Sequence, residues 1–163
     1  MDIVLSKFRP CDFSDYFRLV NDSQVMAMIT ERAIPDDEAR RDYDTLLQAN
    51  DLHPELGQFR IVDEHHGHFI GLAKLAVSDT DAQAAELGYM ILPEYWGQGI
   101  ASQVARMLMR LAREQPQLKS VFAIIDPANL PSRKILINND FVSCEFKDFD
   151  GLPGEILECV WRC

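Results

Sequence analysis

The clearest pattern of apolar and polar positions runs from residue 84 to residue 114. Residues 84–92, AAELGYMIL, are mostly apolar and predict a largely buried strand. After a short turn with two glycines, apolar side chains recur at helical spacing over about 99–114, and arginines lie between them. The chain is therefore predicted to run from a strand through a glycine turn into an amphipathic helix. The apolar positions are Ile100, Val104, Leu108 and Leu111, and the arginines are Arg106, Arg110 and Arg113.

The residues before this segment predict one strand, two helices and two more strands. Residues 2–8 suit a strand, and 9–29 a helix that Asp12 or Ser14 would cap. A second helix is predicted over 34–50, where acidic residues occupy the first turn. Residues 58–77 then predict two strands joined at the sequence EHHGH.

The C-terminal part predicts a strand, a short helix and a final pair of strands. Residues 118–126 are apolar and rich in β-branched side chains, as is typical of a strand. The helix lies within 127–140, with Asn129 as its expected cap. The last two strands, at 141–149 and 155–163, face each other across a turn.

This order of elements predicts a single α/β domain over residues 1–163. A strand–helix–strand unit at 84–125 requires part of the sheet to be parallel, whereas the final pair should be antiparallel. We therefore expect a mixed central sheet of about seven strands, flanked by about four helices.

Composition and charge narrow the classes of function. The net charge of −10 and the pI of about 4.7 argue against a nucleic-acid binder, which needs basic surface. No apolar run is long enough to span a membrane, and residues 1–12 lack the pattern of a signal peptide, so we expect a cytoplasmic protein without membrane or nucleic-acid partners. Four cysteines without metal-type spacing are expected to be free thiols: Cys11, Cys144, Cys159 and Cys163.

The two glycines at the start of the long helix allow two interpretations. The first N–H groups of a helix have no partner inside it, so a turn without side chains lets a phosphate group approach them. Gly97 and Gly99 could equally serve a tight turn for backbone reasons alone. On this stretch by itself the two interpretations have similar weight.

Two motifs carry a resemblance to the GNAT superfamily of acyl-CoA-dependent N-acyltransferases. WGQGIA, at 96–101, resembles the family's loop, in which Gly99 and Ala101 fill fixed positions, while Trp96 stands where Arg or Gln is usual. NLPSRKILINNDF, at 129–141, is similar to the family's closing helix, although Asp140 replaces a Gly. The sequence PEYWGQGIA looks like the subgroup related to ribosomal-protein N-terminal acetyltransferases.

The resemblance implies a GNAT-like domain that takes acetyl-CoA as cosubstrate, without a metal, and exists as a monomer or homodimer. The pyrophosphate would bind the loop, and the pantetheine would lie beside the strand that precedes it. Arg133 and Lys134 could also reach a phosphate of coenzyme A, although exposed helix charges are more often only solvated. The cofactor-binding residues expected from the resemblance are Met90, Ile91, Leu92, Trp96, Gly97, Gln98, Gly99, Ile100, Ala101, Ser102, Asn129 and Ser132.

Glu86 is the catalytic candidate, because it is a carboxylate inside an otherwise apolar strand. It matches the position of the catalytic Glu in some members of the superfamily, but it could also be a structural residue. The family's frequent general acid, a Tyr seven residues after the Asn of the closing helix, is replaced here by Leu136. The alternative function is therefore a CoA-binding regulatory module without catalysis.

The acceptor is expected to be a primary amine, either a protein N-terminus or a small amine, and the acidic chain favours a cationic one. His65, His66 and His68 could suggest a metal site, but a solvated hairpin tip is the better interpretation, since no matching Cys or His cluster occurs elsewhere.

Overall fold

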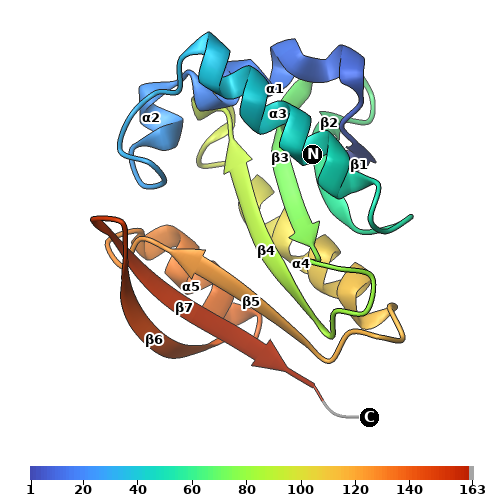
Figure 1. Cartoon of the computed structure of the whole chain (residues 1–163), viewed down its shortest axis with the longest axis vertical. Coiled ribbons are helices and arrows are strands. Elements are labelled where there is room, and N and C mark those ends of the chain that lie inside the picture. The colour runs from blue at the N-terminus through green and yellow to red at the C-terminus, as the bar shows by residue number, and fades with distance from the viewer. Residues whose placement is uncertain (162–163) are drawn as a thin grey trace.

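The central feature of the fold is a seven-stranded mixed sheet in the order β1-β2-β3-β4-β5-β7-β6 (Figure 1). The computed structural model describes residues 1–161. Only β4 and β5 run parallel, and the other neighbouring strands are antiparallel. The predicted mixed sheet and the antiparallel final pair are therefore confirmed. The strands are β1 (Ile3–Lys7), β2 (Gly57–Asp63), β3 (Phe69–Ala76), β4 (Ala84–Ile91), β5 (Ser120–Ile125), β6 (Val142–Phe149) and β7 (Leu152–Val160).

The helices lie on both faces of this sheet. Those of the N-terminal part pack with Phe69 and Leu72 of β3 into one core cluster. Those of the C-terminal part pack into a second cluster, which runs along the opposite face from β1 to β7. None of the helices in residues 1–161 has the length and apolar character needed to cross a membrane. The helices are α1 (Phe13–Val20), α2 (Ser23–Met26), α3 (Asp36–Asn50), α4 (Ile100–Arg113) and α5 (Leu130–Asn138).

The segment 9–29 is not one helix, as the sequence predicted, but a short 3-10 turn, α1 and α2. α1 ends at Val20, and the Asp22 carboxylate then accepts hydrogen bonds from the N–H groups of Gln24 and Val25, at 2.8 and 3.2 Å. This cap starts a new helix in a new direction. Asp12 precedes α1 but does not cap it, because its carboxylate accepts the N–H of Arg9 instead, at 2.9 Å.

The parallel pairing between β4 and β5 is short. It joins only three pairs of residues, from Ala84↔Ser120 to Glu86↔Phe122. Beyond Glu86 the two strands diverge, and Figure 1 shows β5 and β7 turning away from β4 toward the end where α4 begins. The sheet therefore opens along a seam between its two halves.

Candidate active site

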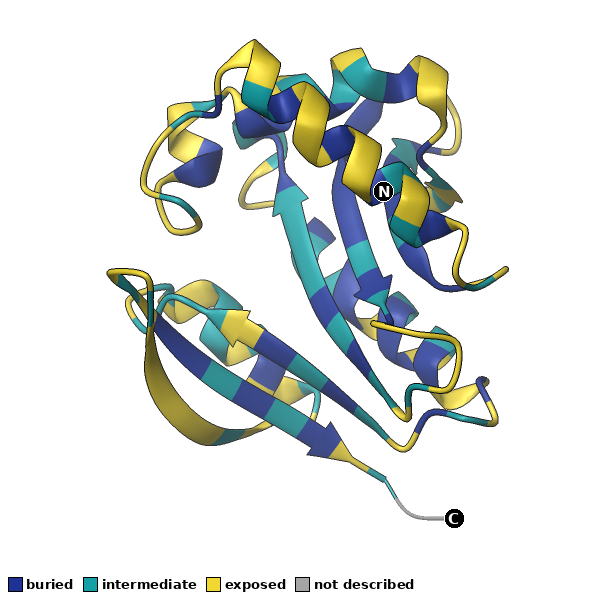
Figure 2. Ribbon diagram, viewed as in Figure 1, coloured by how far each residue is buried: buried dark blue, intermediate teal, exposed yellow. Residues whose placement is uncertain are grey.

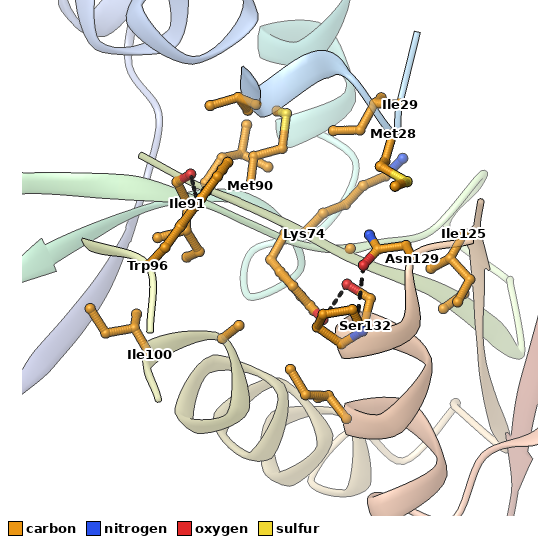
Figure 3. A pocket seen from close by; sticks show the side chains of 18 of the residues that line it. Met28, Ile29, Lys74, Met90, Ile91, Trp96, Ile100, Ile125, Asn129 and Ser132 are labelled. Carbon is orange, nitrogen blue, oxygen red and sulfur yellow. Dashed lines mark hydrogen bonds between the residues drawn. The ribbon is translucent and has the colours of Figure 1, made fainter. Parts of the chain in front are cut away.

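A cavity of about 750 Å³ lies at this seam. It is lined by the diverging ends of β4 and β5, by the N-terminal residues of α4 and α5, and by α2 with the loop that follows it (Figure 3). Its position follows from the short pairing of β4 with β5, because an unpaired strand edge leaves room that no neighbouring strand fills.

The cavity reaches both faces of the sheet. Successive side chains of a strand point to opposite faces. On β4, Leu87, Tyr89 and Ile91 belong to the face packed against α4 and α5. Met90 belongs to the face of α1–α3, as does Lys74, since Leu72 two positions away on β3 packs there. Both sets line the cavity. Two molecules that enter from opposite faces can therefore meet inside it.

One wall of the cavity is the glycine turn and the first turn of α4. The backbone N–H groups from Gly97 to Ser102 have no hydrogen-bond acceptor within the described part of the chain. Gly97 and Gly99 have φ angles of +75° and +76°, and a Cβ on either would meet nothing within 4 Å. The glycines thus serve the backbone of a tight turn, and the space in front of the free N–H groups is open. Both sequence interpretations are compatible with this geometry.

A second wall is the free edge of β4. The N–H of Leu92 donates to the carbonyl of Ile70 on β3, at 2.9 Å. Because hydrogen-bonded residues alternate along an antiparallel pair, the backbone groups of Tyr89 and Ile91 point the other way, into the seam. The Ile91 carbonyl accepts the indole N–H of Trp96 at 2.8 Å, which leaves the Ile91 N–H as a free donor at this edge. Of the predicted backbone segment Met90–Leu92, only Ile91 therefore has a backbone N–H that is free to bind a ligand in the cavity.

The third wall is the start of α5. The Asn129 side chain accepts the N–H of Ser132 at 3.3 Å, so its predicted role as a cap is confirmed. The Tyr89 hydroxyl donates to the Ser132 hydroxyl at 2.9 Å, and burial raises the pKa of Tyr89, so this phenol stays protonated at neutral pH. Sequence reasoning missed this pair. The available signal was a Tyr in an apolar strand, because a buried phenol needs a hydrogen-bond partner.

Arg133 does not extend freely into solvent. Its Nε donates to both carboxylate oxygens of Glu155 on β7, at 3.1 and 3.2 Å, and Glu155 is fully buried. α5 has one fully buried apolar residue, Leu136. The ion pair therefore contributes strongly to the position of α5 beside the cavity. Leu136 lies in the core, at the position where the family often has a Tyr.

Glu86 is the last residue of β4 that pairs with β5. Its carboxylate accepts a hydrogen bond from the Lys74 ammonium at 2.9 Å, and its side chain is 31% exposed. Glu86 stands in an otherwise apolar strand, but the register of β3 and β4 places the Lys74 cation beside its carboxylate. Its proposed catalytic role stays a prediction.

The histidine-rich hairpin lies outside the cavity lining. His65 contacts Asp2 at 2.9 Å, and His66 contacts Asp63 at 3.1 Å. Among residues 1–161, no three His, Cys, Asp or Glu side chains gather in a way that could hold a metal ion. Cys163 lies outside the described residues, whereas Cys11, Cys144 and Cys159 are free thiols.

Comparison with known proteins gives a consistent assignment. Residues 2–142 match the family model described as "Acetyltransferase (GNAT) domain". The chain is 23% identical over 139 residues to an uncharacterized N-acetyltransferase, p20, of Bacillus licheniformis, covering 85% of this chain and 78% of that protein. It is 28% identical over 151 residues to the FsC-acetyl coenzyme A-N(2)-transacetylase of Aspergillus fumigatus, covering 86% of this chain but only 63% of that protein.

Solved structures show the same fold. A GNAT-family acetyltransferase from Bacillus anthracis superimposes with a TM-score of 0.79 at 17% identity, over 98% of this chain and 95% of that one. The spermidine N-acetyltransferase of Vibrio cholerae, solved with CoA and spermine, gives a TM-score of 0.78 at 19% identity, over 97% and 95%. Because the family model matches most of the chain, the protein belongs to the GNAT family, the acetyl-CoA-dependent N-acetyltransferases.

Proposed function

We propose that residues 1–163 form one GNAT domain that transfers an acetyl group from acetyl-CoA directly to a primary amine, which is a cation at neutral pH. We also propose that the chain belongs with the relatives of ribosomal-protein N-terminal acetyltransferases. The observation that carries the proposed reaction is the cavity through the seam, with free N–H groups on one side and Lys74 on the other face of β4. Lys74 lines the cavity and contacts the carboxylate of Glu86, which is not itself among the lining residues.

The residues around the cavity fit coenzyme A. The open N–H groups from Gly97 to Ser102, at the positive end of the α4 dipole, suit a pyrophosphate. The free N–H of Ile91 suits an amide or the thioester carbonyl, where a fixed donor stabilises developing negative charge. Asn129 and Ser132 face the same space from α5.

Acetyl-CoA supplies the reactive thioester, and the chain has to move protons. In the proposed reaction Glu86 accepts one proton from the ammonium group, and Lys74 holds its carboxylate in place. The neutral amine nitrogen then forms a bond to the acetyl carbon and the carbon–sulfur bond breaks. The second proton that the nitrogen loses passes to the sulfur through solvent, so that CoA leaves as the thiol. The Tyr89 hydroxyl, which donates to Ser132 in the structure, would exchange that acceptor for the sulfur of acetyl-CoA and donate its hydrogen bond there. This assigns to a strand residue the donor role that Leu136 cannot fill.

A charge placed at the start of α4 tests the cofactor site. Ser102→Glu puts a carboxylate among the free N–H groups, where it suits the helix but repels pyrophosphate. We expect CoA to bind about 100-fold more weakly, because like charges a few ångströms apart cost several kcal/mol near a protein surface. Ser102→Gln, of equal size and no charge, is the control. Calorimetry measures both affinities, and equal affinities for the two variants would place the pyrophosphate elsewhere.

The second test addresses Glu86. Glu86→Gln should lower kcat at neutral pH by about 10²-fold and leave the affinity for CoA nearly unchanged, because the residue acts on the acceptor. Raising the pH should restore part of the rate, since more of the amine is then neutral. If the variant retains the wild-type turnover, Glu86 is structural.

The alternative function, a CoA-binding regulatory module, is favoured by one observation: Leu136 is buried where the family often has an acid. Release of free CoA with a panel of amines separates the two functions. A regulatory module binds CoA but releases none of it from acetyl-CoA.

A further inference from the structure

The end of the cavity that lies away from the glycine turn carries large apolar side chains in contact with solvent. Met28 and Ile29, in the loop after α2, are each 43% exposed, and Ile124 on β5 is 39% exposed. All three line the cavity. Figure 3 shows Met28 and Ile29 together at one end, away from Trp96 and Ile100. Exposed apolar side chains grouped at a cavity mouth indicate a surface that an apolar ligand covers.

Charged groups are few at this mouth. Of the described residues that line the cavity, only Lys74 and Asp126 are charged. The Lys74 ammonium contacts Glu86, and the Asp126 carboxylate accepts the N–H of Ala128 at 2.9 Å. A ligand with several charges would therefore find few free partners here, whereas one amine could reach Glu86.

Two acidic side chains at the start of α3 are paired with arginines. On α3, Asp36 contacts Arg40 at 2.8 Å, and Glu38 contacts Arg32 at 2.7 Å. These pairs weaken the negative field that would attract a polycation in preference to a single ammonium group.

The floor of the mouth is Gly88, which lies opposite Lys74 in the register of β3 and β4. A Cβ added there would touch only the Lys74 side chain, at 3.9 Å. The absence of a side chain leaves room beside Lys74 for a chain of carbon atoms.

We propose that the acceptor is a monoamine whose nitrogen is attached to an apolar body of several carbons, with Met28, Ile29 and Ile124 as the residues that select it. This inference rests on the proposed acetyl transfer and names its substrate class. The apolar body lies against the three side chains, and the nitrogen points past Gly88 toward Glu86 and the seam.

Two amines of equal length and charge test the inference. Hexylamine has an apolar chain, and aminoethoxyethanol has an ether and a hydroxyl in a chain of the same length. Each buried CH₂ group improves binding by about fourfold. We therefore expect kcat/KM to be at least tenfold higher for hexylamine. Diaminohexane, with a second charge at the apolar end, should be a poorer acceptor than hexylamine.

The double variant Met28→Gln, Ile29→Thr makes both side chains polar, keeps the length of residue 28 and the β-branch of residue 29, and shortens residue 29 by one carbon. It should lower kcat/KM for hexylamine about tenfold, leave the value for aminoethoxyethanol unchanged, and bind CoA as the wild type does. Val142→Thr is the matched control, because Val142 is 66% exposed on β6 and does not line the cavity. It should change neither value.

The outcomes separate this inference from the proposed function. Equal kcat/KM for the two amines, or an unchanged preference in the double variant, would overturn the apolar acceptor while acetyl transfer stands. If CoA binds but no amine in the panel releases CoA from acetyl-CoA, the proposed function itself fails, and the substrate class fails with it. Calorimetry of hexylamine on the CoA-loaded protein gives a check independent of turnover, and binding no tighter than that of aminoethoxyethanol also overturns the inference.

Discussion

The two halves of the sheet differ in how they are covered. In β2 and β3 helices cover both faces, and five consecutive residues of β3, from Phe69 to Ala73, are buried. In β5–β7–β6 one face packs against α4 and α5, and the other keeps Ile124 and Val160 exposed (Figure 2). Within residues 1–161, no member of the α1–α3 core cluster comes from these three strands. A cavity through the sheet is possible because the second half needs no cover on its open face.

The comparison also concerns what holds each half together. The first half relies on apolar packing and on an aromatic group over β3 that includes Phe8, Tyr16 and Tyr43. The second half meets the first along three residue pairs and one packed layer, and α5 depends on an ion pair with a buried carboxylate. The second half is therefore the more sensitive of the two to polar changes.

The largest effect is expected for Arg133→Ala. It leaves the buried Glu155 carboxylate without its cation, which should lower the free energy of unfolding by about 3 kcal/mol. Arg32→Ala is the control in the first half, since the Arg32–Glu38 pair is shorter, at 2.7 Å, but exposed, and it should change stability far less. Urea unfolding measures both. Equal losses would show that the two halves do not differ in this respect.

A slightly smaller change in the free energy of unfolding is expected when CoA is added. At one hundred times its dissociation constant it should stabilise the fold by about 2.7 kcal/mol. Because CoA would fill the seam, hydrogen exchange should slow most at Ile124 and Ile125 of β5, beyond the last pair with β4, and least in the interior of β2. Uniform slowing over both halves would contradict the seam as the binding place.

The smallest effect is expected for a substitution that distinguishes the acceptor face of β4 from its cofactor face. Gly88→Val adds a side chain on the face of Lys74, away from α4 and α5. We expect kcat/KM for the acceptor to fall about tenfold, while CoA affinity changes less than twofold. Gly88→Ala should have an intermediate effect. A loss of CoA affinity in both variants would mean that the cofactor and the acceptor are not divided between the faces.

Local patterns predicted most of the fold. The apolar run at 84–92 and the helical period after it determine β4 and α4, because both depend only on neighbouring residues. The break between α1 and α2 was missed, although Asn21 and Asp22 carry its signal, since an apolar period on both sides suggests continuity. The sequence alone would suggest Gly99→Val as a test of phosphate binding. This substitution is unsuitable, because the φ angle of +76° at residue 99 would strain the backbone of a β-branched residue.

The site was less predictable, because its contacts join distant residues. The contact between Lys74 and Glu86 depends on the register of β3 and β4. The ion pair between Arg133 and Glu155 depends on the position of β7 in the sheet. The Tyr89–Ser132 bond joins β4 to α5 across 43 positions of sequence. Family resemblance pointed to Ser132, but nothing in the local pattern identified its partner.

The indole of Trp96 gives the protein an optical reporter at the cavity. The chain has two tryptophans. Trp96 is 49% exposed and donates its N–H to the Ile91 carbonyl at the cavity wall. Trp161 packs beside the core with the Arg113 guanidinium 5.1 Å from its ring centre, and it does not line the cavity. Displacement of water from the Trp96 ring shifts its emission to shorter wavelength while Trp161 serves as an internal reference, so the filling of the cavity can be followed by fluorescence without a label.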